Sequence, residues 1–384
     1  MKKNLSFLFL LSLLVTACSA SPQPSQEATP APYSPDTPSP SQIDAPLVDS
    51  LTLISVQFLN SLDGWGVTET QIVRTNDGGI TWYNVTPPAV TETGYAAVLS
   101  LTDNNHAWLL LPDFETSPHS GILHRTADGG LSWNSIAVPF SIADLHFLDA
   151  NNGWALADLG VGAGSQAVAV YQTTDGGAAW TQKFANDPNG GAGDSLPLGG
   201  LKAGIAPVTM QTAFVYGVTY ASGAPYLFRT DDGGASWSPV SLPLPKGAES
   251  AELSIERGQM KFLSPTDGFI AMRLTSENYQ LAIYTTRDGG NTWTLTPNIL
   301  PGSGTADFVS VEDAVVFSGD QFYVTRDAAR TWSIVLPDVK FGDIFAGMDF
   351  ANTTTGWVVT MTPTGQRAVY RSGDGGLTWF PIVP

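Results

Sequence analysis

The sequence predicts an all-β fold, a seven-bladed β-propeller of four-stranded antiparallel blades, on the basis of three observations. A segment with Thr or Ser, an aspartate two residues later and a tryptophan five residues beyond that occurs seven times. The seven aspartates lie 39 to 57 residues apart, which is typical of repeat folds whose units pack on their neighbours. Each repeat contains four short alternating segments, and a closed ring of four-stranded units leaves only short sheet edges exposed.

We call each of these eight-residue segments a box. The boxes occupy residues 75–82, 126–133, 173–180, 230–237, 286–293, 325–332 and 372–379. The aspartate can accept hydrogen bonds from N–H groups of its own turn, and the glycines that usually follow it tolerate positive φ. The boxes are therefore predicted to be turns between strands three and four of each blade. Their aspartates are predicted to be structural and not catalytic: Asp77, Asp128, Asp175, Asp232, Asp288, Asp327 and Asp374.

The sixth box differs from the others because Ala328 and Ala329 replace both glycines. Its turn is predicted to be strained or of another type. Ahead of each box, two apolar alternating runs flank a polar turn, as in residues 56–67, and this pattern predicts a β-hairpin. All eleven tryptophans fall in the hairpin motif or the box, so we expect them to pack blades together.

The first 18 residues have the pattern of an export signal. Lys2 and Lys3 precede an apolar run at residues 5–14, and Cys18 follows small residues. We predict that residues 1–18 are a lipoprotein signal and that Cys18 carries the lipid; the alternative is a cysteine that ends an ordinary signal peptide. The protein is expected to be exported and anchored to the cell membrane or outer membrane, facing the periplasm or the cell exterior.

The rest of the chain divides into a linker and one folded unit. Residues 19–46 contain eight prolines and few aliphatic residues, which predicts a disordered linker. Residues 47–384 are predicted to form the propeller, which we expect to be a monomer. The only cysteine is Cys18, so no intramolecular disulfide is expected.

Charge and motif content exclude several classes of ligand. The chain has 35 acidic and 17 basic residues, a net charge of −18, which argues against nucleic acid as a partner. The four histidines lack the spacing of a metal-binding set, and no phosphate-binding glycine loop precedes a helix. We therefore predict no metal and no cofactor.

Antiparallel connectivity predicts two different faces of the ring. The boxes share one face, which we call the box face; the longer connections lie on the opposite, long-loop face, where recognition is expected. Candidate contact residues on the long-loop face are aromatic: Tyr95, Phe114, Tyr220, Tyr279, Phe341 and Phe345. For each of them, a solvated loop residue or a small local cluster is the alternative.

The boxes resemble the bacterial neuraminidase repeat, or Asp-box, of sialidases, xyloglucanases, sortilins and photosystem II assembly factors. The Gly-Trp-x-Val hairpin at residues 64–67, followed by Arg-Thr-x-Asp-Gly-Gly-x-Thr-Trp at residues 74–82, resembles most the photosystem II stability and assembly factor family. That resemblance implies a non-enzymatic scaffold for a protein partner, such as a membrane-protein subunit or an assembly intermediate. The family's tryptophan-containing strand ahead of the first hairpin is missing from residues 44–50, which leaves the mode of ring closure open.

A carbohydrate-active protein is the alternative, either a glycosidase of the sialidase type or a glycan-binding protein. The Arg-Ile-Pro signature of sialidases is missing ahead of the repeats, and xyloglucanases pair two such propellers around a cleft. Two loop carboxylates could still hydrolyse a glycoside, but the sequence singles out no such pair.

Overall fold

The computed structural model describes residues 43–94, 96–112, 120–186 and 195–382, which belong to the compact unit formed by residues 40–384. Within these residues the chain forms β-strands and one short 3₁₀ helix, η1. No helix in the described part of the chain is long and apolar enough to cross a membrane. The predicted all-β class is confirmed.

The strands pair in chain order into antiparallel sheets. The first three sheets contain β1 (Ser55–Phe58), β2 (Gly64–Val67), β3 (Ile72–Thr75) and β4 (Tyr83–Asn84); β5 (Val98–Leu101), β6 (Ala107–Leu110), β7 (Gly121–Thr126) and β8 (Asn134–Val138); and β9 (Ala143–Phe147), β10 (Gly153–Gly162), β11 (Ser165–Thr173) and β12 (Thr181–Ala185). The last two contain β22 (Thr305–Phe308), β23 (Asp313–Ser318), β24 (Gln321–Arg326) and β25 (Ser333–Val335); and, after η1 (Gly342–Ile344), β26 (Phe345–Phe350), β27 (Gly356–Met361), β28 (Arg367–Ser372) and β29 (Phe380–Ile382).

Between these lies a nine-stranded sheet made of two four-stranded parts and one joining strand. Its strands are β13 (Leu201–Pro207), β14 (Ala213–Val218), β15 (Tyr226–Thr230), β16 (Ser238–Pro239), β17 (Glu252–Ser254), β18 (Met260–Phe262), β19 (Gly268–Thr275), β20 (Tyr279–Thr286) and β21 (Thr294–Pro301). Strand β17 pairs with β14 on one side and with β19 on the other. We number the four-stranded groups as meanders 1 to 7 in chain order, with β13–β16 as meander 4 and β18–β21 as meander 5.

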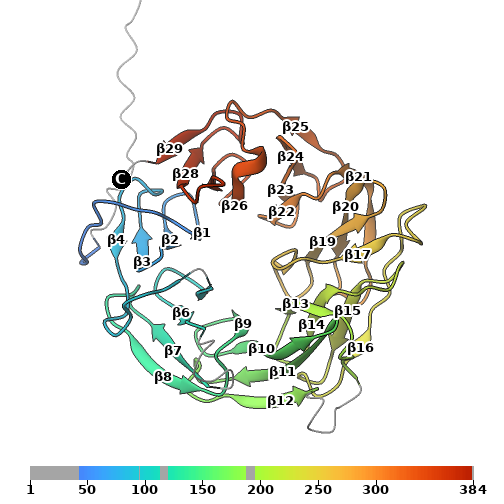
Figure 1. Ribbon diagram of the computed structural model, residues 1–384, viewed down its shortest axis with the longest axis horizontal. Helices are drawn as coiled ribbons and strands as arrows, with labels where there is room; N and C mark the ends of the chain where they lie inside the picture. Colours follow the sequence, from blue (N-terminus) through green and yellow to red (C-terminus); the bar gives the residue numbers. More distant parts are fainter. Residues whose placement is uncertain (1–42, 95, 113–119, 187–194, 383–384) are drawn as a thin grey trace, which may run out of the picture. The chain divides into compact units, whose positions relative to one another are not determined.

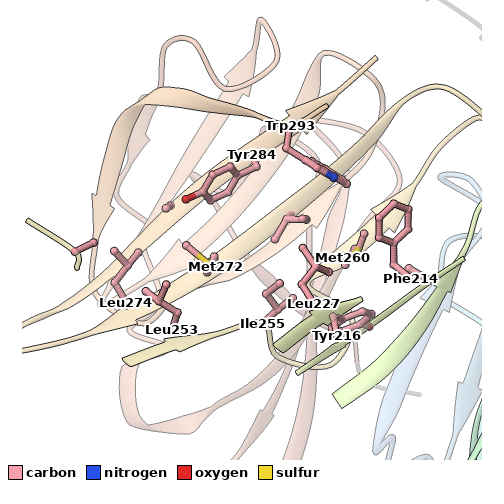
Figure 2. Close-up of a cluster of buried hydrophobic side chains, with 14 of the residues drawn as sticks. Phe214, Tyr216, Leu227, Leu253, Ile255, Met260, Met272, Leu274, Tyr284 and Trp293 are labelled. Carbon is pink, nitrogen blue, oxygen red and sulfur yellow. The ribbon is translucent and has the colours of Figure 1, made fainter. Parts of the chain in front are cut away.

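The meanders of the described unit surround a central space, with the first strand of each on the inside and the fourth on the outside (Figure 1). Apolar clusters fill the spaces between neighbouring meanders; one of them, between meanders 4 and 5, contains Phe214, Tyr284 and Trp293 (Figure 2). Each meander therefore buries both of its faces against neighbours, which is how a ring of small sheets builds one continuous core.

Each box forms a hydrogen-bonded turn. In the first box the Thr75 hydroxyl donates to Asp77 Oδ1 (2.9 Å) and accepts the N–H of Gly79 (3.0 Å). The same carboxylate accepts the N–H of Thr81 (2.9 Å), and the two glycines have φ of 78° and 92°. The hydroxyl-to-aspartate and backbone-to-aspartate bonds recur in the other six boxes.

The sixth box keeps this conformation without glycine. Ala328 and Ala329 have φ of 58° and 62°, in the left-handed region that residues with a Cβ avoid. Thr325 and Thr331 still bond Asp327 at 2.9 and 2.6 Å. The hydroxyl and the N–H of Thr331 lower the pKa of Asp327 to about 2. The box bonds thus hold two alanines in a strained backbone conformation.

One aromatic contact recurs between neighbouring meanders. Trp108 of meander 2 stacks on Phe147 of meander 3, with ring centroids 3.7 Å apart, and its Nε1 donates to the carbonyl of Gly176 in the next box (3.0 Å). Between meanders 7 and 1, Trp357 stacks on Phe58 with a centroid distance of 3.3 Å. The indole of Trp357 donates to the carbonyl of Gly78 at 3.0 Å.

The contact between Trp357 and Phe58 closes the ring. Meander 1 and meander 7 are each built from four consecutive strands, so no strand is exchanged between the two ends of the described unit. The ring closes by the same stacked aromatic pair and indole hydrogen bond that join meanders 2 and 3. Residues 46–48 add to the outer edge of β4, where Val48 donates to the carbonyl of Trp82 (3.0 Å) and Asn84 donates to the carbonyl of Pro46 (2.8 Å).

A second set of links joins the innermost strands. Asp349 on β26 accepts the N–H of Phe58 (2.6 Å), and Asp307 on β22 accepts the N–H of Phe350 (2.7 Å). Nζ of Lys261 lies 3.7 Å from Asp307. Burial, reinforced by the negative charge of Asp307, raises the pKa of Asp349 above its usual range.

Replacing Phe58 with Ala is expected to lower the free energy of unfolding by about 3 kcal/mol or more, because it removes a buried ring at the junction that closes the ring. Phe147→Ala, at the equivalent stack between meanders 2 and 3, should cost a similar amount. Urea unfolding followed by tryptophan fluorescence measures both. A much smaller loss for Phe58→Ala would show that closure depends on other contacts.

Ala328→Gly is expected to stabilise the protein by about 0.5 to 1 kcal/mol, because glycine adopts the positive φ of this position without strain. Ala127→Gly is the matched control, since Ala127 is exposed in the second box and does not have positive φ. It should leave stability unchanged or lower it slightly. Thermal unfolding of the two variants measures these changes. Destabilisation by Ala328→Gly would show that the backbone at Ala328 is not strained.

Asp349→Asn is expected to change how stability depends on pH. Because the folded pKa of Asp349 is raised, the stability that its proton contributes is fully present below the unfolded pKa of about 4 and is lost as pH rises through the folded pKa. The amide introduced by the substitution can still accept the N–H of Phe58 but does not ionise. The variant should therefore gain stability relative to the native protein as pH rises from about 4; parallel profiles in urea unfolding would contradict this.

Candidate functional site

The long-loop face is most elaborate over meanders 3 to 5. Strands β10 and β11 have ten and nine residues, against four in β2 and four in β3. The extra residues extend this hairpin beyond the ring, with a bulge between Asp158 and Gly160 and a tight turn at Ala163 and Gly164. Meanders 4 and 5 are joined on the same face by β17. The result is a continuous surface of three meanders, which we call the platform.

Hydrogen bonds of the backbone and of the Gln166 side chain hold the extended hairpin to the start of β13 and to the residues just before it. The N–H of Gln166 donates to the carbonyl of Leu198 (3.0 Å), and that of Gly200 donates to the carbonyl of Gly164 (2.9 Å). The side chain of Gln166 accepts the N–H of Lys202 (2.7 Å) and donates to Asp158 (3.0 Å). The hairpin is therefore fixed at its tip as well as at its base.

Lys202 adds further hydrogen bonds between the hairpin and meander 4, and we call this bonded region the Lys202 clasp. Its ammonium donates to the carbonyls of Gln166 (2.8 Å), Leu198 (2.7 Å) and Gly200 (3.2 Å), and it lies 4.8 Å from the centroid of the Tyr226 ring. Burial lowers the pKa of Lys202 to about 8, an effect that Asp158 opposes. Three acceptors for three ammonium protons indicate a structural role and disfavour a nucleophilic one.

A charged pocket of about 280 Å³ opens beside Lys202. Apolar side chains from meanders 2 and 3, among them Val98 and Ile142, form one wall. The other wall is polar and consists of Asp144, Asp158, Gln166, Lys202 and Arg257. It therefore offers both charge signs next to an apolar surface.

Asp144 is the most strongly bonded carboxylate of this pocket. It accepts bonds from Arg257 (2.7 Å), from His146 (3.0 Å) and from the N–H of Ile205 on the next inner strand (2.9 Å). Burial alone would raise the pKa of Asp144, but His146 and Arg257 outweigh it and hold the pKa well below its usual range. Asp144 is therefore ionised at neutral pH and is a poor proton donor.

A larger apolar pocket, of about 410 Å³, lies on the other side of the clasp. Its walls are formed by the segments around β15 and β16 and by the loop that contains Leu198 and Gly200. The lining residues include Pro197, Tyr226, Phe228, Pro239, Val240 and Leu242. Tyr226 separates the two pockets, because Lys202 covers its ring from the side of the charged pocket. The two pockets are thus neighbours on one rigid surface.

Two of the predicted contact residues lie exposed on meanders of the platform. Tyr220 is 64% exposed, and its ring lies 3.1 Å from the position that a Cβ on Gly164 would occupy. Tyr279, at the start of β20, is 56% exposed. Tyr95 and Phe114 lie outside the described residues.

The prediction for Phe341 is wrong, and that for Phe345 holds only in part. Phe341 is fully buried and packs edge-on against Phe317 and Trp379, at centroid distances of 6.2 and 5.2 Å. Phe345 is half-buried and stacks on Phe317 at 4.4 Å. Both rings fill the space between meanders 6 and 7, because a loop that joins two packed sheets can bury its aromatic residues between them.

The predicted box residues lie away from the platform. The seven box aspartates are in their turns, and none lines either pocket. Cys18 lies outside the described residues. Within the described ranges, no group of three His, Cys, Asp or Glu side chains could hold a metal ion.

Sequence reasoning missed Asp144, Asp158, Gln166, Lys202 and Arg257. They lie in meander 3, in meander 4 and in the connection that leads to meander 5, so no local motif joins them. The one available signal is Lys202, an isolated charge in a stretch of Gly, Ala and Leu at residues 196–206.

Comparison with known sequences gives a partial match. No protein-family model matches the chain. A xyloglucanase from Hypocrea jecorina (strain QM6a) is 25% identical over a 248-residue alignment that covers 56% of this chain and 29% of that protein. The chain thus spans less than a third of the curated relative that it matches.

Comparison with solved structures identifies the architecture. YCF48 bound to D1 peptide has a TM-score of 0.53 at 17% identity, over 89% of this chain and 96% of that one. A GH74 xyloglucanase from Xanthomonas campestris has a TM-score of 0.59 at 14% identity, over 88% of this chain but 55% of the enzyme. YCF48 from Cyanidioschyzon merolae has a TM-score of 0.50 at 15% identity, over 86% and 95% of the two chains. At these identities the likeness concerns the fold alone. The chain is a β-propeller that resembles YCF48, a photosystem II assembly factor, as its boxes predict.

Proposed function

We propose that the seven meanders are the blades of a seven-bladed propeller, and that this propeller is a non-enzymatic scaffold that binds a polypeptide on the platform. The observation that carries the proposal is the pair of neighbouring pockets on a surface held rigid by β17 and the Lys202 clasp. Rigid concave sites that combine apolar walls with a few placed polar groups are the usual form of binding sites.

A polypeptide fits the chemistry of the two pockets. The apolar pocket suits one or two aliphatic or aromatic side chains, and the exposed rings of Tyr220 and Tyr279 provide flat contact areas nearby. The charged pocket offers Arg257, 58% exposed at its side chain, and carboxylates that can accept backbone or side-chain N–H groups. The likeness in fold to YCF48, whose structure contains a D1 peptide, agrees with a protein ligand.

The chemistry of the pocket supports binding over catalysis. Asp144 is held ionised by its partners, and the ammonium protons of Lys202 all have acceptors. Glycoside hydrolysis needs one carboxyl group that carries a proton and a second that is ionised. We further propose that the box aspartates are structural. Cys18 carries a lipid outside the cytoplasm on this proposal. The protein is then a monomer whose partner is a membrane-protein subunit or an assembly intermediate.

A carbohydrate ligand is the second candidate, because Asp144 and Asp158 both line the charged pocket and the fold also resembles GH74 enzymes. On this alternative the protein would bind or hydrolyse a glycan such as xyloglucan. The two candidates differ in ligand but share the platform, so one set of variants tests both.

Peptides selected from a displayed random library against residues 19–384 are expected to bind the platform. Tyr220→Ala and Arg257→Gln should each weaken a selected peptide by about tenfold, because they remove an exposed ring and an exposed cation without emptying the core. Calorimetric titration measures the affinity. Leu131→Ser, on the box face of meander 2, is the control and should leave the affinity unchanged.

Two results would overturn the proposal. One is peptide binding that is lost with Leu131→Ser and kept with the platform variants. The other is binding or hydrolysis of xyloglucan oligosaccharides, lost with Asp158→Asn, with no selected peptide bound at the platform; this result would favour the carbohydrate alternative.

A further inference from the structure

Large exposed apolar side chains are not spread evenly over the described unit. Seven such residues are at least 60% exposed. Two of them, Val161 and Tyr220, belong to the platform. The other five lie along the outer side of meanders 6, 7 and 1: Ile334, Leu336, Phe380, Ile80 and Leu47. We call this group, together with the 53% exposed Leu377, the seam rim.

Hydrogen bonds hold the part of the seam rim on meanders 6 and 7 together. The N–H of Asp338 donates to the carbonyl of Leu377 (3.1 Å), and the N–H of Trp379 donates to the Asp338 carboxylate (3.0 Å). The segment that carries Leu336 is thus fastened along the seventh box, and Phe380 follows that box directly. We refer to these exposed side chains as an apolar strip; the two meanders that carry them are hydrogen-bonded to each other.

The strip continues across the closing junction to meander 1. Ile382 at the end of β29 packs on Gly79, with its Cδ1 3.0 Å from the position that a Cβ there would occupy, and Ile80 is the next residue. Leu47 forms a bridge with Tyr83 on β4. The outer strands β25, β29 and β4 follow one another around the ring (Figure 1).

A clustered apolar strip indicates a contact surface. Single exposed apolar residues are common on soluble proteins and need no explanation. Large contiguous apolar patches are rare on them and usually mark a protein or membrane contact. The seam rim contributes nothing to the core, so stability does not account for its residues.

The path of the chain indicates which surface covers the seam rim. Residues 46–48 are bonded to the outer edge of β4, so the polypeptide enters the described unit beside Leu47. The preceding 42 residues contain the predicted export signal and the predicted lipid attachment at Cys18. The part of the chain that is predicted to carry the lipid therefore joins the described unit beside the seam rim. A net charge of −18 disfavours anionic headgroups.

We propose that the seam rim rests on a lipid surface of zwitterionic headgroups, with Leu336 and Phe380 inserted at the boundary between headgroups and acyl chains. This contact adds to the predicted lipid on Cys18, because stable membrane attachment usually takes two signals. The two pockets lie around meanders 3 and 4, across the ring from meanders 7 and 1 (Figure 1). A unit seated on the seam rim therefore presents its binding pockets away from the lipid.

Flotation of residues 19–384 with phosphatidylcholine vesicles tests the proposal, because this chain lacks both the predicted signal and Cys18. The native unit should float with the vesicles at low and high salt, since apolar contacts are not screened. Leu336→Ser with Phe380→Ser should lower partitioning by about tenfold or more. Ile122→Ser with Leu131→Ser removes two side chains of meander 2 that are 52% and 51% exposed, and should leave partitioning unchanged.

A label supplies a second readout that does not depend on the serine variants. Residues 19–384 contain no cysteine, so Leu336→Cys gives one site for a polarity-sensitive dye. Its emission should shift to the blue with vesicles, and that of Ile122→Cys should not. The proposal is overturned if the native unit does not float, if both labels respond alike, or if light scattering shows a dimer that Leu336→Ser with Phe380→Ser dissociates, because a second copy would then cover the strip.

Discussion

The packing of a hairpin tryptophan on the next meander's first strand and box is the contact on which the rest of the structure depends. Trp108 stacks on Phe147 and bonds the box carbonyl of Gly176; Trp357 makes the same contacts with Phe58 and Gly78. Box glycines bring the backbone within reach of the indole, and their positive φ keeps the turn tight. Because meander 7 packs on meander 1 as meander 2 packs on meander 3, the ring closes without strand exchange.

Closure by repeated packing leaves the loops free to differ. Strand β2 of meander 1 has four residues, whereas meanders 3 to 5 have an extended hairpin, the joining strand β17 and two pockets. Because the ring is rigid, it can hold a buried lysine at a fixed position. Lys202 loses its hydration and forms instead three hydrogen bonds to carbonyl groups and a contact with an aromatic ring. The platform and the seam rim thus lie on different meanders of one ring.

The boxes and hairpins could be read from the sequence because they are local. The strained sixth box, with Ala328 and Ala329 at positive φ, follows from two missing glycines. Whether an individual aromatic residue in a loop is buried does not follow from the sequence. Phe341 is buried between meanders 6 and 7, while Tyr220 is exposed beside Gly164. An aromatic residue in a loop has the same local sequence signature whether a neighbouring sheet covers it or leaves it in solvent.

By itself the sequence determined the repeat, its strands and turns, and hence the propeller fold, because box and hairpin each encode their own backbone conformation within about ten residues. Only the tertiary structure decided how the ring closes, which residues line the pockets, and why Asp144 and Asp349 have pKa values shifted in opposite directions. Asp144 meets Arg257 from another part of the chain as well as His146 on its own strand, whereas Asp349 meets the like charge of Asp307 on the neighbouring meander. Charges in low dielectric respond to neighbours in space, and those neighbours are far apart in the chain.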